Sequence, residues 1–272
     1  MNIVEFGKLI SDSFEYTKDG LLVNPVTWIL LIILTLLPVV PFVLVLVVMF
    51  PSLMAGVVPD ITTLIAVFII AITLAIVLAA FYQGYLLKIF RGEKTLPAVS
   101  GFTTLFIDGL KYFVIEIVYL IPVIVILALT IGAAVMAAIS AGSDLYALVP
   151  ILGGVLIGVL IALIVAFIIS LFAIIGVIRF ARTGCMGEAF NFNAITATIG
   201  RIGWGSYILA LIIVLVIIVI VQVILSAIPY IGGILQLIIS PFISVFFTRY
   251  LTQVYESGEP TVPETAAAPG PE

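Results

Sequence analysis

Three polar side chains within long apolar runs are the candidates for chemistry in this chain: Glu116, Gln222 and Gln236. A carboxylate in lipid is costly and is by default a candidate for a functional site. Glu116 lies about one helical turn, roughly 5–6 Å, beyond Tyr112, where its run begins. Reaching back to the interface, or pairing with Arg179 or Arg182, would also satisfy it. Glu116 is therefore either a functional acid or a structural one.

The two glutamines lie symmetrically about Pro229, seven residues on either side of it. If the chain turns at Pro229, Gln222 and Gln236 reach a similar depth on adjacent antiparallel helices. An amide pair at such a position forms an interhelical hydrogen bond, which contributes about 0.6–2 kcal/mol. We interpret the pair as structural, and a role in holding a substrate is the alternative.

Most of the usual catalytic chemistry is missing from the chain. It has no histidine, the commonest general base and metal ligand, and one cysteine, Cys185, so no intrachain disulfide can form. It shows no phosphate-binding loop, no metal-ligand cluster, no carboxylate pair at catalytic spacing and no nucleophile elbow. We therefore expect a protein that is not an enzyme and has no metal site and no cofactor.

Composition identifies lipid as the solvent for most of the chain. Hydrophobic residues make up 64% of the 272 residues and charged residues 9%, with a mean hydropathy of +1.46. Soluble domains carry about 25% charged residues, and their cores cannot bury this much apolar surface. The net charge of −4 gives no basic excess, which argues against binding to nucleic acid. The expected partners are the lipid bilayer and, beyond it, a membrane protein or a second copy of the chain.

Apolar runs long enough to cross a bilayer, which takes roughly 20 helical residues, predict an all-α integral membrane bundle of six helices. The fourth run is the longest, and we interpret it as one helix because only glycines offer a break in it. We expect one domain over residues 1–255, built from three helical hairpins at about 28–87, 112–178 and 204–251. The six runs are 28–50, 61–87, 112–139, 149–178, 204–228 and 230–251.

The basic residues predict which side of the membrane each connection faces. All ten lie in the N-terminal segment, in 88–111, in 179–201 or at Arg249, and the alternate connections, such as 51–60 and 140–148, hold none. Because basic connections stay in the cytoplasm, we expect a multi-pass protein of the cell membrane with both termini cytoplasmic. The residues taken to determine this topology are Lys88, Arg91, Lys94, Lys111, Arg179, Arg182 and Arg201.

Prolines within the predicted spans are expected to kink helices and to free backbone carbonyls, because proline lacks an amide hydrogen. Transporters use such breaks to bind ions and substrates, although prolines are also ordinary in membrane helices. Gly154 and Gly158 have the spacing that permits close packing of membrane helices, which is a weak signal. The kink residues are Pro38, Pro41, Pro122 and Pro241.

Several predicted helix ends carry cap residues. Asn24 and Pro25 are typical of an N-cap and the first helical position of a span. The second, fourth and sixth spans end alike, in polar and aromatic residues followed by Gly92, Gly184 or Gly258, which can stop a helix in the left-handed conformation. Either a threefold repeat or the common chemistry of membrane interfaces explains this likeness.

Amphipathic segments precede the hairpins. Phe6, Ile10 and Phe14 recur at helical spacing before the first hairpin, and a similar apolar stripe runs over 102–113 before the second. Such segments are typical of helices that lie in the cytoplasmic interface. Residues 256–272 hold four prolines and four acids, which predicts a disordered acidic cytoplasmic tail.

Several short stretches of the chain occur together: Gly84-Tyr-Leu, Arg91-Gly-Glu, Leu96-Pro97, Asp108-Gly-Leu-Lys111-Tyr112, Ala181-Arg-Thr-Gly184 and Ala189-Phe-Asn-Phe192. As a set they resemble an uncharacterised archaeal family of polytopic membrane proteins, a domain of unknown function. That family is related to a wider group that includes the membrane domain of glycerophosphodiester phosphodiesterases. The resemblance implies a six-helix integral membrane protein without an established activity, so no site residue is carried over from it.

Three classes of function remain. We favour a transporter or a protein that handles lipids or other small molecules, because proline-broken hairpins suit this class. A non-catalytic scaffold, or a subunit of a larger membrane complex, is the alternative. A membrane-embedded enzyme is the third class, for which Glu116 is the strong candidate residue. A tightly packed bundle without a cavity or lateral groove would exclude the first class.

Overall fold

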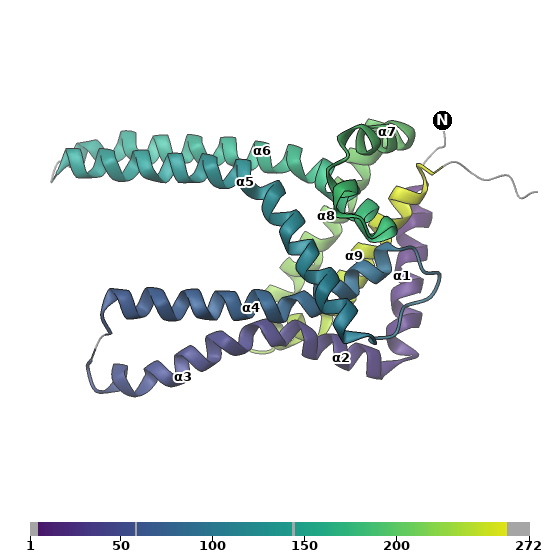
Figure 1. Ribbon diagram of the computed structural model, residues 1–272, viewed down its shortest axis with the longest axis horizontal. Coiled ribbons are helices and arrows are strands. Elements are labelled where there is room, and N and C mark those ends of the chain that lie inside the picture. The colour runs from purple at the N-terminus through teal and green to yellow at the C-terminus, as the bar shows by residue number, and fades with distance from the viewer. Residues whose placement is uncertain (1–4, 58, 143–144, 260–272) are drawn as a thin grey trace, which may run out of the picture.

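The computed structural model describes residues 5–57, 59–142 and 145–259, and these residues form helices joined by short connections, without a strand (Figure 1). The all-α class predicted from the sequence is confirmed. With η for 3-10 helices, the elements are α1 (Phe6–Leu22), α2 (Pro25–Leu36), η1 (Leu37–Val39), α3 (Val40–Met54), α4 (Ile61–Phe90), α5 (Phe102–Ala141), η2 (Leu145–Ala147), α6 (Leu148–Thr183), η3 (Met186–Phe190), α7 (Phe192–Ile202), α8 (Trp204–Ser226) and α9 (Gly232–Glu256).

Six helical segments of the described chain are long and apolar enough to cross a membrane, the number expected from the sequence, and they fit a multi-pass membrane protein. The fourth apolar run is one uninterrupted helix, α6. The third segment begins at Phe102 rather than at Tyr112, because the amphipathic stretch before it continues into the same 40-residue helix. The segments are Pro25–Ser52, Ile61–Phe90, Phe102–Ala141, Leu148–Thr183, Trp204–Ser226 and Gly232–Glu256.

The prolines interrupt some helices and not others. The first segment is broken between α2 and α3 by η1, which contains Pro38, and Pro41 follows in the first turn of α3. The long helix α5 contains Pro122 and is visibly bent along its length (Figure 1). Pro241, by contrast, lies within α9, which stays α-helical from end to end.

Side-chain caps begin two of the six long apolar segments. The side-chain oxygen Oδ1 of Asn24 accepts a hydrogen bond from the Thr27 amide at 3.4 Å, and Pro25 occupies the first turn of α2, so the predicted start is confirmed. Asp60 caps α4 in the same way, accepting from the Thr63 amide at 3.0 Å. Each cap satisfies a backbone donor that has no partner within its own helix.

The predicted glycine stops are right for two helices and wrong for the third. Gly92 and Gly184 follow the ends of α4 and α6 with φ angles of +87° and +72°, the left-handed region that glycine favours. Gly258 is not among the residues with positive φ. Its role is close packing instead, because a Cβ there would meet the Ile202 side chain on α7 at 2.5 Å.

The buried side chains gather where α4, α6 and α9 finish, which we call the packed end. Tyr85, Ile178 and Tyr250 are fully buried there, one from each of these helices. Elsewhere the helices are largely exposed: only 11–33% of the most apolar stretch of each of the six segments is buried within the chain. The remaining apolar surface is available to lipid. Packing of the helices on one another is therefore concentrated at one end of the chain.

Helix α1 packs on α9 and crosses the direction of α3 and α4 in Figure 1. Its most buried side chains are the small Ser13 and Thr17 together with Leu21, and the Ser13 hydroxyl donates to the Gln253 side chain at 3.3 Å. Phe14, part of the predicted apolar stripe, stays 49% exposed. Its ring nevertheless contacts the Phe242 ring on α9, with centroids 5.7 Å apart, so the stripe and the small polar side chains both form the contact with α9.

Candidate functional site

A groove of about 260 Å³ lies among α4, α5, α6 and α9, next to the packed end. Its lining is mainly aliphatic and aromatic, and at its rim Leu120 is 40% exposed. Such a mainly apolar hollow with few polar groups is the usual form of a small-molecule site. The lining side chains that carry polar atoms are Tyr112, Glu116, Tyr119 and Ser170.

Glu116 supplies the carboxylate of the groove. Its side chain is half-buried and interacts with the hydroxyl of Tyr112, one turn earlier on α5. The ion pairs among the described residues do not include Glu116. Its carboxyl group is therefore not held by a basic side chain of the described residues and can interact with a molecule in the groove.

The pairing of Glu116 with Arg179 or Arg182, one of the two structural expectations, is wrong. The Arg179 guanidinium pairs with Glu188 in η3, and the Arg182 guanidinium pairs with Glu256 at the end of α9 at 2.7 Å. Both arginines lie in the last turns of α6, beside acids that follow α6 and end α9. Arg179 and Arg182 are therefore paired with these acids and not with Glu116.

The hydroxyl groups of two other lining residues donate hydrogen bonds to backbone carbonyls. The Tyr119 hydroxyl donates to the Ala189 carbonyl at 2.5 Å, and the Ser170 hydroxyl donates to the Phe167 carbonyl within its own helix at 2.7 Å. A Cβ at Gly176 would collide with Ala189, so glycine is needed for this approach of η3 to α6. These commitments leave Glu116 as the charged group of the groove.

The basic residues taken as topology determinants lie at the packed end and in the connections next to it. The Lys88 ammonium donates to the Ser100 carbonyl at 2.6 Å, and Arg91 pairs with Asp108 on α5. Arg201, at the end of α7, donates to the Gly258 carbonyl at 2.7 Å. Lys94 follows α4 and Lys111 lies on α5. Arg179 and Arg182 form the ion pairs with Glu188 and Glu256.

The last residues of the described chain belong to this network rather than to a free tail. Glu256 is the final residue of α9, and Glu259 accepts from Arg182 at 2.9 Å. The folded chain therefore continues to Glu259, past the boundary predicted at residue 255. The rest of the predicted tail, 260–272, lies outside the described residues.

Gln222 and Gln236 form a pair away from the groove. The side-chain Nε2 of Gln236 on α9 donates to the side-chain Oε1 of Gln222 on α8 at 2.8 Å. This is the interhelical hydrogen bond expected from their positions about Pro229. Neither glutamine lines the groove that contains Glu116. The structure thus brings the two amides together and keeps them separate from the carboxylate.

The carbonyls around Pro241 already have hydrogen-bond donors. Pro241 has no amide hydrogen for the Leu237 carbonyl, and the Ser240 hydroxyl donates to that carbonyl at 2.9 Å. The Trp28 indole donates to the neighbouring Ile238 carbonyl, also at 2.9 Å. These carbonyls therefore already accept hydrogen bonds that support α9 and its contact with α2.

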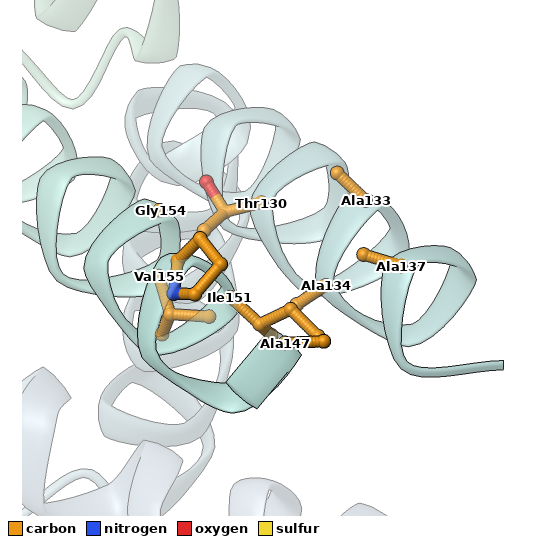
Figure 2. A pocket seen from close by; sticks show the side chains of 9 residues that line it. Thr130, Ala133, Ala134, Ala137, Ala147, Ile151, Gly154 and Val155 are labelled. Atoms are coloured by element: carbon orange, nitrogen blue, oxygen red, sulfur yellow. The ribbon is translucent and has the colours of Figure 1, made fainter. Parts of the chain in front are cut away.

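A second hollow, of about 440 Å³, lies between α5 and α6 far along the pair from the packed end. Figure 2 shows its lining, in which Ala133, Ala134 and Ala137 of α5 lie across from Gly154 of α6. Its hydroxyl group, from Thr130, already donates to the Ile126 carbonyl at 2.8 Å. The other lining side chains are apolar, so the hollow offers a ligand little chemistry.

The sequence contained part of the signal for the groove. Tyr112, Glu116 and Tyr119 are spaced four and three residues apart, which puts them on one face of a helix. Of these three residues the acid alone was predicted as a candidate, and the two tyrosines were not. The contributions from α6 and α9, such as Ser170 and Phe247, depend on tertiary contacts that no local pattern records.

A protein family described as "Protein of unknown function (DUF4013)" matches residues 67–230, which is more than half of the chain. The matched region contains Glu116 and the parts of α5 and α6 that line the groove. No curated protein and no solved structure matches the chain.

Proposed function

We propose a function for this chain, which belongs to the DUF4013 family of proteins of unknown function, from the geometry of its groove. The chain binds a lipid or another amphiphilic small molecule between α4, α5, α6 and α9, and carries or positions that molecule without transforming it. The observation that supports this is one carboxylate, Glu116, within a mainly apolar groove of about 260 Å³. Such a lining suits a molecule with one polar head and an apolar body.

The proposed orientation puts the packed end and both termini at the cytoplasmic face. The basic residues at this end support it, because such residues are retained on the cytoplasmic side. The six segments then form three hairpins, α2/α3 with α4, α5 with α6 and α8 with α9, within which the helices pack on one another. Helices α1 and α7 lie along the cytoplasmic interface in this arrangement.

A molecule reaches the groove sideways from the membrane in this proposal. The rim residue Leu120 is exposed, and the apolar lining next to it continues toward the lipid-facing surface. A non-catalytic role is supported by the hydroxyls of Tyr119 and Ser170, which are held by backbone carbonyls. Apart from the Tyr112 hydroxyl that interacts with Glu116, the lining supplies no second carboxylate, lysine or histidine for general acid–base chemistry.

A scaffold or subunit role is the second candidate. It is favoured by the charged side chains exposed on α1, which include Lys8, Asp12 and Glu15. Against it, arginines of the packed end such as Arg182 are engaged within the chain. Kinship with the membrane domain of glycerophosphodiester phosphodiesterases, and an archaeal source, stay predictions from the resemblance.

The experiment is mass spectrometry of what co-purifies with the full chain in native-lipid discs. We expect one lipid or small molecule to be enriched over the bulk membrane, and Ala173→Phe, which fills the groove, to reduce that enrichment several-fold. The matched control is Ala134→Phe, which fills the hollow of Figure 2 and should leave the enrichment unchanged. The unfolding temperature of each variant is first compared with that of the wild type, to establish that both variants are folded.

Two results would contradict the proposal. Equal enrichment in wild type and a folded Ala173→Phe variant would mean that the groove is not the binding site. A stoichiometric protein without an enriched small molecule would favour the scaffold role instead.

A further inference from the structure

We infer that the head group held in this groove is cationic: the ligand is an amphiphile that carries an amine or a quaternary ammonium. The inference rests on the proposed function and names the chemical class of its ligand. Glu116 brings a negative charge to the groove, and neither lysine nor arginine is among the lining residues.

The nearby arginines do not reverse this charge, because acids already hold them. Arg179 pairs with Glu188, and Arg182 pairs with Glu256 at 2.7 Å and with Glu259 at 2.9 Å. An anionic head group would therefore face the Glu116 carboxylate without a basic partner. In a site of low dielectric constant, such like-charge contact is strongly unfavourable.

Aromatic rings give the groove a second feature that suits a cation. Tyr112 and Tyr119 of α5 line it together with Phe90 of α4 and Phe247 of α9. The face of an aromatic ring attracts an ammonium group, by about 0.5–2 kcal/mol for each contact, and most strongly where water is excluded. A groove lined by one carboxylate and four aromatic side chains therefore suits an ammonium, through charge and through contact with the rings.

A neutral polar head group fits less well. A sugar or glycerol head needs several hydrogen-bonding side chains to replace the water that it loses. In this groove the hydroxyls of Tyr119 and Ser170 donate to the backbone, at 2.5 Å and 2.7 Å, and that of Tyr112 interacts with Glu116. The donors of the lining hydroxyls are therefore already used, and the strongest remaining group is the carboxylate, an acceptor that attracts positive charge.

The apolar part of the groove fits the rest of such a molecule. Beyond Glu116 the lining on α5 and α6 continues through Leu120, Val123, Ile169 and Ala166. A volume of about 260 Å³ holds a head group and the first carbons of a chain, and the remainder extends past the exposed Leu120 into lipid. The arrangement selects by head group and tolerates different tails.

The test uses three single-chain probes of equal tail length: dodecyltrimethylammonium, dodecyl phosphate and dodecyl maltoside. Each is titrated onto the full chain in discs of neutral lipid, and bound probe is counted by native mass spectrometry. We expect the ammonium probe to bind at least about tenfold more tightly than the other two, which corresponds to about 1.4 kcal/mol. Glu116→Gln should remove this preference, and Glu116→Asp should keep part of it.

The matched control is Gln236→Leu, which changes a polar side chain outside the groove and should leave binding of all three probes unchanged. Equal binding of the three probes, or a preference that survives Glu116→Gln, would overturn the cationic ligand and leave the proposed function standing. If Ala173→Phe changes the binding of none of the probes, the groove itself is not the site, and both proposals fail.

Discussion

Arg91 and Arg182 each cap the helix that carries the other. Arg91 Nε donates to the carbonyl of Ala181, the residue before Arg182, at 3.2 Å. Arg182 Nε donates to the carbonyl of Phe90, the residue before Arg91, at 3.4 Å. The last carbonyls of a helix lack partners in their own helix, and positive charge is favourable beside them. This exchange therefore joins the ends of α4 and α6.

The reciprocal caps predict that the two arginines are energetically coupled. Arg91→Ala and Arg182→Ala should each destabilise the protein, and the double variant should lose less than the sum. We expect a coupling energy of about 0.5–3 kcal/mol, the usual range for residues in one hydrogen-bond network. The measurement is a double-mutant cycle of unfolding free energies in mixed micelles. Lys94→Ala is the control, and strictly additive losses would contradict the coupling.

Gly84 should tolerate no side chain. A Cβ at this position on α4 would collide with the backbone carbonyl of Leu105 on α5, and a backbone carbonyl cannot rotate away. We expect Gly84→Ala to cost about 1–3 kcal/mol, as overpacking does. Gly153→Ala is the matched control on α6, because nothing lies within 4 Å of its Cβ. The control should be neutral or stabilising by up to about 1 kcal/mol, and thermal unfolding compares the two.

The amide pair of α8 and α9 should contribute modestly to stability. Gln222→Leu removes the 2.8 Å hydrogen bond from Gln236 and is expected to cost about 0.6–2 kcal/mol. Gln222→Leu with Gln236→Leu should recover part of this loss, because it leaves no unpaired amide in the apolar region. Unfolding in micelles measures both. Loss of all function with an intact fold would instead mean that the amides bind a ligand.

The Arg179–Glu188 pair should make stability depend on pH. The hydrogen bond from Arg179, and next that from Asn191, lower the pKa of Glu188 below its ordinary value of 4.5. The folded state thus favours the carboxylate, so the stabilisation is fully present above pH 4.5 and is lost as the pH falls through the lowered pKa. The difference in unfolding temperature between wild type and Glu188→Gln should shrink over that range. With Arg179→Gln as background, the pH dependence of this difference should disappear.

Cys185 provides a direct test of orientation, because it is the one cysteine of the chain and is exposed after α6. With the packed end in the cytoplasm, a membrane-impermeant maleimide should label it in inside-out vesicles and not in intact cells. Ser140→Cys in a Cys185→Ser background should show the opposite pattern, because Ser140 is exposed near the far end of α5. Labelling of Cys185 in intact cells would reverse the proposed topology.

Features that depend on local sequence were predictable. The number of helices long and apolar enough to cross a membrane follows from the lengths of the apolar runs, since a span takes about 20 residues. The contact between Gln222 and Gln236 follows from their equal distances from Pro229, because a turn there fixes their depths. The α-helical start at Asn24 follows from its cap chemistry.

Features that depend on tertiary contacts were not predictable. Arg182 and Glu256 lie 74 residues apart, and nothing in the pattern around either one indicates the other. For the same reason Glu116 was assigned partners that the fold uses elsewhere. Gly258 has the position of a helix stop, yet glycine is needed there because a larger residue would collide with Ile202. Periodicity and caps do not encode which helix faces which.

Because the buried side chains are concentrated at the packed end, the measured stability of the protein depends on what surrounds the rest of its helices. Two apolar helix surfaces gain little by leaving lipid for each other, because lipid tails are as apolar as leucine. Away from the packed end the acyl chains are therefore the packing material, and the membrane completes the tertiary structure. Detergent replaces that material, so an unfolding temperature is a property of the chain together with its solvent, and variants are comparable only within one lipid composition.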